Sequence, residues 1–205
     1  MPNREPKAFW RWTALCCCAV GLSACFGQGL KHGADPSVLI QTDRGAIVVQ
    51  VDTRNAPITA ANFLRYVDEG RFSSASFYRT VRMDNQPNNE VKIEVIQGGI
   101  GFAESDLRLA PIPHETTAKT GLRHLDGTFS MARSEPGSAS SEFFICIGDQ
   151  PELDFGGRRN PDGQGFAAFG VVVEGMDVVR DIQSRPDSSQ MLTEPVRIRG
   201  VRRLK

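Results

Sequence analysis

Few residues of this sequence have the types and spacing that common catalytic sites require. The chain has no Gly-x-Ser-x-Gly motif, and the serines of residues 138–141 have no neighbouring histidine. It also lacks a Cys-x-x-Cys pair, and His114-Glu115 is not completed by the second histidine of a His-Glu-x-x-His motif. These absences disfavour a serine hydrolase and leave His114 and His124 as a minor alternative for a metal site.

Arg79 stands among apolar residues in the segment FYRTVR, residues 77–82. Because strand side chains alternate between two faces, the pattern predicts that Phe77, Arg79 and Val81 share one face. An edge strand with a solvated face would explain these residues, since most surface arginines are only solvated charges. Whether this guanidinium serves chemistry therefore depends on the rest of the sequence.

The first elements of the domain are a hairpin and a helix. The segment SVLIQTDRGAIVVQVD, residues 37–52, has two β-branched runs separated by a turn that contains glycine, which is typical of a hairpin. The segment APITAANFLRYVDEG, residues 56–70, has apolar residues at helical spacing between Pro57 and Gly70. It predicts an amphipathic helix that packs on a sheet.

Short apolar strands then follow as far as residue 173. The segments FYRTV, KIEVIQGG, TFSMAR, EFFICIG and AAFGVVV are separated by turn residues such as Asp126-Gly127. Strands at this spacing suggest a barrel or a sandwich. A second helix is predicted around residues 176–183, before a last strand in PVRIRGVRRL.

The composition indicates a globular protein with one sizeable core. Hydrophobic residues make up 40% of the chain and charged residues 23%. The 24 basic residues balance the 24 acidic residues. We therefore expect no general attraction to nucleic acid or to an anionic membrane.

The amino terminus has the features of a secretory signal. Basic residues precede an apolar run, residues 12–22, that is too short to span a bilayer. The run ends in Leu-Ser-Ala-Cys, which resembles the bacterial lipobox, where cleavage before the cysteine leaves it to carry lipid. We predict a lipoprotein signal peptide in residues 1–24, lipidation at Cys25, a flexible tether in residues 25–36 and one domain in residues 37–205. A non-lipidated signal cut nearby and a weak uncleaved anchor are the alternatives.

The cysteine content of the mature chain then allows no intramolecular disulfide. Three of the five cysteines leave with the signal and Cys25 would be acylated, so Cys146 alone remains in the domain. Its place in the apolar segment FFICI predicts a buried thiol rather than a nucleophile or a metal ligand.

Six segments, taken in order, resemble the motifs of one known family. FYRTV, VIQGG, TFSMAR, SEFFI, LD and FAAFG are similar to motifs of the cyclophilin-type peptidyl-prolyl cis-trans isomerases, and the resemblance runs from about Val38 to Leu204. It implies a mainly β fold, a closed antiparallel barrel of eight strands capped by two helices. It also implies an enzyme that rotates X-Pro peptide bonds in a groove outside the barrel, with no cofactor and no metal.

The resemblance also implies roles for the residues that match these motifs. Arg79 stands where the family has its catalytic arginine, and Gln97 matches the glutamine that orients this arginine and the substrate. Phe144 matches the floor of the proline pocket. The other substrate-binding residues that the motifs imply are Val95, Ala132, Leu153 and Phe166.

Such a site needs no nucleophile, because the reaction is a rotation. The barrier, about 18 to 20 kcal/mol, exists because the nitrogen lone pair is delocalised into the carbonyl group. A guanidinium held against the prolyl nitrogen as its lone pair localises would stabilise the twisted state more than the planar one. The resemblance therefore explains an arginine among apolar neighbours.

The sequence departs from the family pattern just before Gln97. The chain is longer there than in compact relatives, which predicts a polar loop at residues 82–94 beside the groove. Val95 then falls where a pocket methionine is usual and Glu94 where a phenylalanine is usual, unless the register shifts and Ile93 fills the pocket.

Three further departures change charge. Glu142 replaces the usual glutamine of the Phe-Phe-Ile motif and adds a carboxylate near the groove, and Arg133 stands where many relatives have asparagine. Glu152 takes the place of the aromatic residue associated with cyclosporin binding. We expect weak inhibition by that drug, and nanomolar inhibition in a peptide assay would contradict this.

The sequence predicts a lipid-anchored isomerase on the periplasmic side of the bacterial envelope that assists the folding of exported proteins. Phe26, rather than aspartate, after the lipid cysteine suggests the outer membrane. The expected partners are proline-containing unfolded or partly folded polypeptides, with membrane contact only through the lipid, and a monomer is the family default. The alternative is a catalytically weak peptide-binding or chaperone module of the same fold, with Glu94 and Glu142 reshaping the groove.

Overall fold

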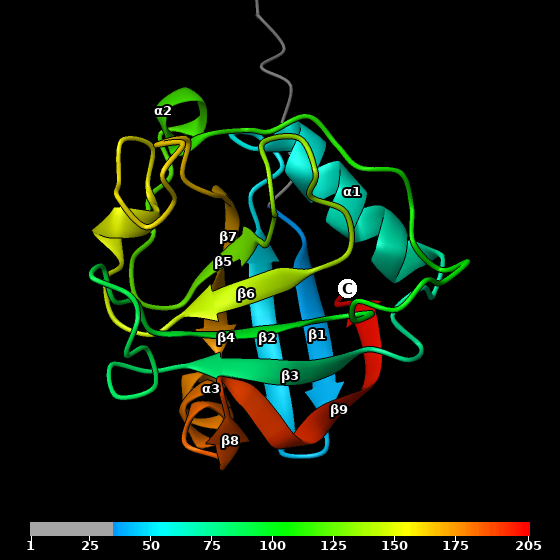
Figure 1. Ribbon diagram of the computed structural model, residues 1–205. Coiled ribbons are helices and arrows are strands. Elements are labelled where there is room, and N and C mark those ends of the chain that lie inside the picture. The colour runs from blue at the N-terminus through cyan, green and yellow to red at the C-terminus, as the bar shows by residue number, and fades with distance from the viewer. Residues whose placement is uncertain (1–34) are drawn as a thin grey trace, which may run out of the picture. The chain divides into compact units, whose positions relative to one another are not determined.

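The computed structural model describes residues 35–205 of the chain (Figure 1). The predicted signal peptide, Cys25 and the predicted tether as far as residue 34 lie outside the described residues. In the part of the chain from residue 35 onward, no helix is both long enough and apolar enough to cross a membrane.

Nine antiparallel strands of residues 35–205 form one sheet in the order β1-β2-β7-β5-β6-β4-β3-β9-β8. Their bounds are β1 (Ser37–Thr42), β2 (Gly45–Val51), β3 (Ser76–Val81), β4 (Val95–Gly99), β5 (Thr128–Met131), β6 (Phe143–Cys146), β7 (Ala167–Glu174), β8 (Asp187–Ser188) and β9 (Met191–Arg203). In Figure 1, β3, β4 and β6 run across the front, and β1 and β2 cross behind them.

Pairing between the first and last long strands closes this sheet into a barrel. β1 pairs with β9 from Val38 opposite Arg203 to Thr42 opposite Ile198. Eight strands thus close on themselves, while the two-residue β8 extends β9 on one side. The residue pattern left a barrel and a sandwich open, and the closed eight-stranded antiparallel barrel implied by the family resemblance is confirmed.

Aromatic rings fill the interior of the barrel. The ring centroid of Phe129 lies 5.0 Å from that of Phe63, 5.0 Å from that of Phe143 and 4.8 Å from that of Phe169. Phe77 joins them through Phe143, at 5.8 Å. All five side chains are almost completely buried. Because the interior is packed in this way, a ligand has to bind outside it.

Two helices lie at opposite ends of the barrel (Figure 1). α1 (Pro57–Asp68) begins with proline in its first turn, and Gly70 follows it in the left-handed conformation at φ 64°. α3 (Met176–Gln183) has the predicted bounds. Both helices contribute side chains to the core. Three short elements were not predicted from the sequence: α2 (Thr117–Thr120), the 3-10 helix η1 (Pro151–Leu153) and the two-residue strand β8.

The first turn of α1 is capped by a distant residue. Ala56, at the N-cap, has no side-chain acceptor. The Glu115 carboxylate instead accepts hydrogen bonds from the backbone N–H groups of Ile58 and Thr59, at 3.2 and 2.7 Å, and from the Thr59 hydroxyl at 2.7 Å. A long-range contact thus satisfies donors that the helix leaves unpaired.

Strand β3 contains a β-bulge at Tyr78. Phe77 pairs with Gly98, and Arg79 pairs with the adjacent Gln97, so Tyr78 has no partner of its own on β4. Phe77 therefore points into the aromatic core while Arg79 points to the outer wall. The prediction that Phe77 and Arg79 share a face was wrong, because simple alternation assumes a strand without a bulge.

The inserted residues 82–94 form a loop organised around one buried amide. The segment KIEVIQGG was predicted to be a strand throughout, but β4 begins only at Val95. Gln86 is 1% exposed, and its amide donates to the Ile93 carbonyl oxygen at 2.8 Å. Its Oε1 accepts from the Arg159 guanidinium at 3.0 Å. The loop thus has its own anchor beside the outer wall.

Candidate active site

Three adjacent strands bring Arg79, Gln97 and Phe144 into one row. Arg79 lies opposite Gln97 in the β3–β4 pair, and Gln97 lies opposite Phe144 in the β4–β6 pair. Residues paired across antiparallel strands project from the same face of the sheet. The bulge that turns Arg79 outward therefore joins it to the other two side chains on the outer wall of the barrel.

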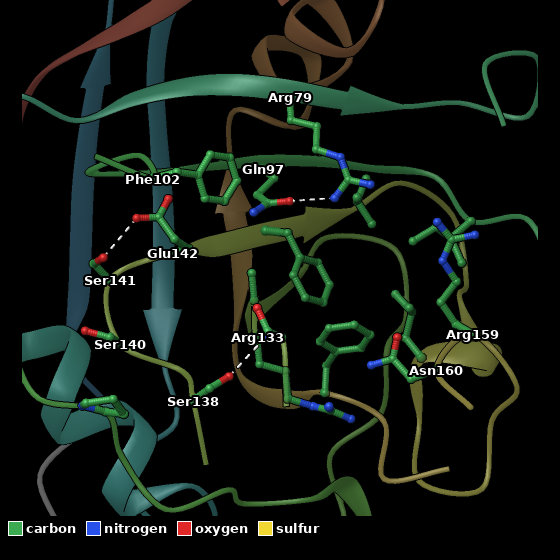
Figure 2. A pocket seen from close by; sticks show the side chains of 18 of the residues that line it. Arg79, Gln97, Phe102, Arg133, Ser138, Ser140, Ser141, Glu142, Arg159 and Asn160 are labelled. Carbon is green, nitrogen blue, oxygen red and sulfur yellow. Dashed lines mark hydrogen bonds between the residues drawn. The ribbon is translucent and has the colours of Figure 1, made fainter. Parts of the chain in front are cut away.

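Two neutral amides hold the guanidinium of Arg79. Its Nη1 donates to Gln97 Oε1 at 2.8 Å, the contact drawn in Figure 2. Its Nε and Nη2 donate to Gln190 Oε1, at 3.1 and 2.6 Å. Gln190 lies in the turn between β8 and β9, with φ 72°. The sequence did not point to Gln190, because it lies 111 residues from Arg79 and belongs to none of the motifs.

The positive charge of Arg79 is not neutralised by a carboxylate. Within residues 35–205 this guanidinium forms no salt bridge, and both side-chain acceptors are uncharged. Burial lowers the pKa of Arg79 from its ordinary value, because desolvation disfavours the charged form. An arginine nonetheless stays protonated at neutral pH. A full positive charge is therefore held beside the groove.

All seven residues predicted for the site line one groove with a volume of about 520 Å³. They are Arg79, Val95, Gln97, Ala132, Phe144, Leu153 and Phe166. Lining residues that the sequence did not single out include Phe102, Arg108, Leu109, Pro111, Arg159 and Asn160. Figure 2 shows the labelled polar members around the rim. A shared location is what the predicted roles require, and the roles themselves stay predictions.

An apolar patch forms the floor of the groove next to Arg79. Phe144 is 4% exposed and meets Phe166 edge to face, with ring centroids 5.3 Å apart. Val95, Leu153 and Ile93 pack in the same outer cluster. Val95 and Ile93 both line the groove, so the two alternatives for the pocket position both contribute. The patch offers a dry surface to an apolar ring.

A hydrogen-bonded chain lies behind Phe144. The His124 ring stacks on Phe144, with centroids 5.9 Å apart and planes 14° apart. His124 Nδ1 lies 2.7 Å from Asp154 Oδ1, and its Nε2 lies 2.9 Å from Ser130 Oγ. Both ring nitrogens are engaged, which disfavours the metal site considered for His114 and His124. In the described part of the chain, no group of three metal-ligating side chains is placed to hold an ion.

Arg133 forms one side of the groove. Its guanidinium carbon lies 5.2 Å from the centre of the Phe166 ring, a cation–π arrangement. The same guanidinium pairs with both carboxylate oxygens of Asp162, at 2.8 and 2.9 Å. This pairing lowers the pKa of Asp162 to about 2. Arg133 therefore joins the strand wall to the loop that carries Phe166.

The three glutamates that depart from the family pattern occupy different places. Glu142 lines the groove, as predicted. Glu152 does not line the groove, and it pairs with the exposed Arg158 at 3.0 Å. Glu94 does not line the groove either, and its Oε1 accepts from the Gln183 amide of α3 at 3.4 Å. Of these carboxylates only Glu142 is therefore in a position to act on a bound molecule.

Comparison with known proteins identifies one family. The family model described as "Cyclophilin type peptidyl-prolyl cis-trans isomerase/CLD" matches residues 37–203. The chain is 37% identical over 172 residues to peptidyl-prolyl cis-trans isomerase A of Dickeya dadantii, covering 83% of this chain and 80% of that protein. It is 37% identical over 150 residues to peptidyl-prolyl cis-trans isomerase B of Escherichia coli, covering 71% and 83%.

A solved structure has the same fold. The crystal structure of a cyclophilin-type peptidyl-prolyl cis-trans isomerase from Cryptosporidium parvum matches with a TM-score of 0.65 and 20% identity, covering 83% of this chain and 98% of that chain. At this identity the likeness concerns the fold alone.

Proposed function

The chain belongs to the cyclophilin-type peptidyl-prolyl cis-trans isomerases, and from this premise we propose that Arg79 is the residue that catalyses rotation of the X-Pro bond. The observation that carries the proposal is the partly buried guanidinium of Arg79, which forms no salt bridge within residues 35–205 and is held by Gln97 and Gln190 beside an apolar floor. A proline ring on Phe144 would bring its nitrogen toward this charge. As the bond twists, the nitrogen lone pair localises and becomes a better acceptor for Arg79.

The surroundings of Arg79 support catalysis by differential binding. The planar amide nitrogen is a poor hydrogen-bond acceptor, so Arg79 gains most of its interaction in the twisted state. An apolar floor excludes water and strengthens the interaction between the guanidinium and the nitrogen. In this proposal Gln97 orients the guanidinium, while Val95, Ala132, Leu153 and Phe166 bind the substrate around the Phe144 floor. No bond between heavy atoms breaks, so the site needs no general base.

The test compares cis-to-trans exchange of a short X-Pro peptide by the domain and by an Arg79→Ala variant. We expect kcat/KM to fall by about 100-fold or more, as for the loss of a preorganised electrostatic donor. Arg180→Ala is the matched control, because this arginine lies on α3 in an exposed pair with Asp126 and does not line the groove. An Arg79→Ala variant that folds and keeps full activity would refute the role of Arg79.

We also propose that the enzyme acts on exported proteins from a lipid anchor at Cys25. The Leu-Ser-Ala-Cys sequence at the end of a short apolar run supports this, and Phe26 after the cysteine supports the outer membrane. Its clients would then be proline-containing polypeptides that fold on the periplasmic side of the envelope. Full-length protein labelled with a radioactive fatty acid should lose the label in Cys25→Ser. Unlabelled wild-type protein in a soluble fraction would contradict the anchor.

Membership of the isomerase family favours an enzyme over the weak binding module considered from the sequence. That alternative rested on Glu94 and Glu142, and of these only Glu142 lines the groove, so the position of Glu94 also favours the enzyme. The same exchange assay distinguishes the two functions. If the wild-type domain binds proline peptides but their cis-to-trans exchange is no faster than in buffer alone, the binding-module alternative is favoured.

A further inference from the structure

A continuous chain of hydrogen bonds links the Glu142 carboxylate to the guanidinium of Arg79. Tyr78 donates its hydroxyl proton to Glu142 Oε2 at 2.5 Å. The phenol oxygen accepts from Gln97 Nε2 at 3.0 Å, and Gln97 Oε1 accepts from Arg79 Nη1 at 2.8 Å. Two neutral side chains therefore connect an acidic residue to the proposed catalytic cation.

The bulge and a glycine make this chain of hydrogen bonds possible. In a regular strand Tyr78 and Arg79 would point to opposite faces, but the bulge lets both reach Gln97 on the outer wall. Gly99 has φ 145°, and a Cβ atom there would lie 2.5 Å from Glu142 Oε2. Only glycine leaves room for the carboxylate at this point.

The charge on Glu142 fixes the direction of every donor in the chain. Each carboxylate oxygen is already an acceptor, since Oε1 receives the Gly101 N–H at 3.1 Å and the Ser141 hydroxyl at 2.9 Å. With Glu142 ionised, the Tyr78 proton points to Oε2, and the phenol oxygen is free to accept from Gln97. Gln97 must then present its carbonyl oxygen, not its amide nitrogen, to Arg79.

Protonation of Glu142 disturbs this order. A proton on Oε2 would point at the Tyr78 oxygen, and the phenol proton would then meet the Gln97 N–H group. Rotating the amide relieves that conflict but turns an N–H group toward Arg79. A proton on Oε1 leaves the order intact but makes Glu142 a weaker acceptor for Tyr78, since bonds to charged groups are about twice as strong. In either case the hydrogen bond by which Gln97 holds the Arg79 guanidinium is weakened or lost.

We propose that Glu142 is a positioning residue for this enzyme, and that its ionised form holds Arg79 in the active arrangement through Tyr78 and Gln97. The inference rests on the proposed function of Arg79. The isomerase is then sensitive to pH, although its reaction moves no proton. Activity is complete while Glu142 is charged and declines as pH falls and the carboxylate takes up a proton.

The environment of Glu142 moves this titration to higher pH than that of an ordinary glutamate. Burial raises the pKa of Glu142, because the charged form is desolvated. Burial and the neighbouring carboxylate raise the pKa of Tyr78 well above its usual value, so the phenol keeps its proton. Arg108 is the nearest cation, with its Nη2 3.9 Å from Glu142 Oε1. That Nη2 already donates to the carbonyl oxygens of Gly101 and Ala103.

The experiment measures kcat/KM for an X-Pro peptide by NMR exchange between about pH 4.5 and 8, a range that begins just above the ordinary glutamate pKa of about 4.3 and extends beyond that of histidine. An exchange assay avoids a coupling protease with its own pH dependence. The variants are Glu142→Gln, which removes the charge, and Tyr78→Phe, which keeps the carboxylate but breaks the chain of hydrogen bonds. Circular dichroism at each pH confirms folding. The carboxyl 13C signal of Glu142 in the wild type gives its pKa independently.

We expect wild-type kcat/KM to fall about fivefold below the pKa of Glu142, the difference between a charged and a neutral hydrogen bond expressed as a rate. The decline in kcat/KM should fit the titration of a single proton, with its midpoint at the pKa that the 13C signal of Glu142 gives. Both variants should lack this decline. His114→Gln should keep the decline, since His114 does not line the groove and its Nε2 lies 3.2 Å from the Gln164 carbonyl oxygen.

Two outcomes would overturn the inference. One is a flat wild-type profile down to the lower limit in a protein that stays folded. The other is a decline that Tyr78→Phe retains, which would mean that Glu142 acts without the chain or does not act. If Glu142→Gln fails to fold, Tyr78→Phe and the 13C titration still test the proposal. Loss of activity in Arg79→Ala at neutral pH is a separate result, so either proposal can fail alone.

Discussion

The guanidinium of Arg79 is held by acceptors that leave its charge intact. A carboxylate in place of either amide would hold the side chain as firmly, but it would neutralise much of the field that acts on the prolyl nitrogen. Gln97 and Gln190 instead supply oriented dipoles without net charge. The choice of amides is therefore part of the proposed mechanism.

Gln190 provides a direct test of this view. We expect Gln190→Ala to lower kcat/KM by about tenfold, because the loss of hydrogen bonds to a charged donor is worth about 1.5 kcal/mol or more. Gln190→Glu should lower kcat/KM further, because a carboxylate would neutralise much of the charge on Arg79. This loss is expected even though the ion pair would hold the Arg79 side chain more firmly. Steady-state kinetics by NMR exchange would measure both.

The control for these variants is Gln41→Ala, an exposed glutamine of β1 that does not line the groove. All three variants should unfold at urea concentrations near that of the wild type. Equal or higher activity in Gln190→Glu would show that Arg79 does not act through its unneutralised charge.

At the scale of elements, contacts between distant segments complete structures that local sequence leaves unfinished. α1 begins after Ala56, a poor N-cap residue, and Glu115 supplies the missing acceptor from a loop 56 residues along the chain. The bulge in β3 and the Gln86 anchor of the inserted loop likewise depend on partners in other segments.

The cap at α1 predicts a loss of stability without a loss of chemistry. Glu115→Ala should lower the free energy of unfolding by about 1 to 3 kcal/mol, because it leaves the buried N–H and hydroxyl donors of Thr59 and the partly buried N–H of Ile58 unpaired. Glu115→Gln should cost less, since one amide oxygen can still accept. Urea denaturation would measure both changes.

Glu104→Ala is the comparison for these cap variants, because Glu104 is an exposed loop residue. The Michaelis constant of Glu115→Ala should match that of the wild type at temperatures where the variant is folded. An unchanged urea midpoint in Glu115→Ala would show that the cap contributes nothing.

Some of these features were predictable from the sequence and others were not, for physical reasons. The bounds of α1 follow from Pro57 and Gly70, because these residues restrict the backbone of their immediate neighbours. The row of side chains that includes Arg79 and Gln97 was predictable because each of these residues belongs to a family motif. The face of Phe77 was predicted wrongly because a bulge is a property of two paired strands. Gln190 and Glu115 escaped prediction because a side chain's partner across the fold leaves no local pattern.

For the whole molecule, closure between β1 and β9 is the contact that turns a sheet into a barrel. The closing pairs include Leu39 with Arg202 and Ile40 with Val201, and Leu204 N–H donates to the Ser37 carbonyl oxygen at 2.8 Å. The last residues of the chain thus protect the first strand of the domain.

A truncation after Gly200 should open this closure. We expect it to reduce the free energy of unfolding by about 3 kcal/mol or more, since several backbone hydrogen bonds of about 1 kcal/mol each are lost together. Amides of β1 should exchange with deuterium much faster than those of β4 and β6, which keep their partners. Mass spectrometry after deuterium exchange would measure this.

Removal of Lys205 alone is the control, because Lys205 takes no part in the β1–β9 pairs. Protection of β1 that survives truncation after Gly200 would mean that β1 is held by β2 and the core without closure.

The wall of the barrel separates two apolar clusters that never share a side chain. Rings such as Phe77 and Phe143 fill the inside, and Phe144, Val95 and Leu153 cover the outside. Selection for stability and selection for substrate can therefore act on different residues of the same strands. Substitutions in the outer cluster could therefore change which clients bind, while the inner cluster and the stability of the fold stay the same during evolution.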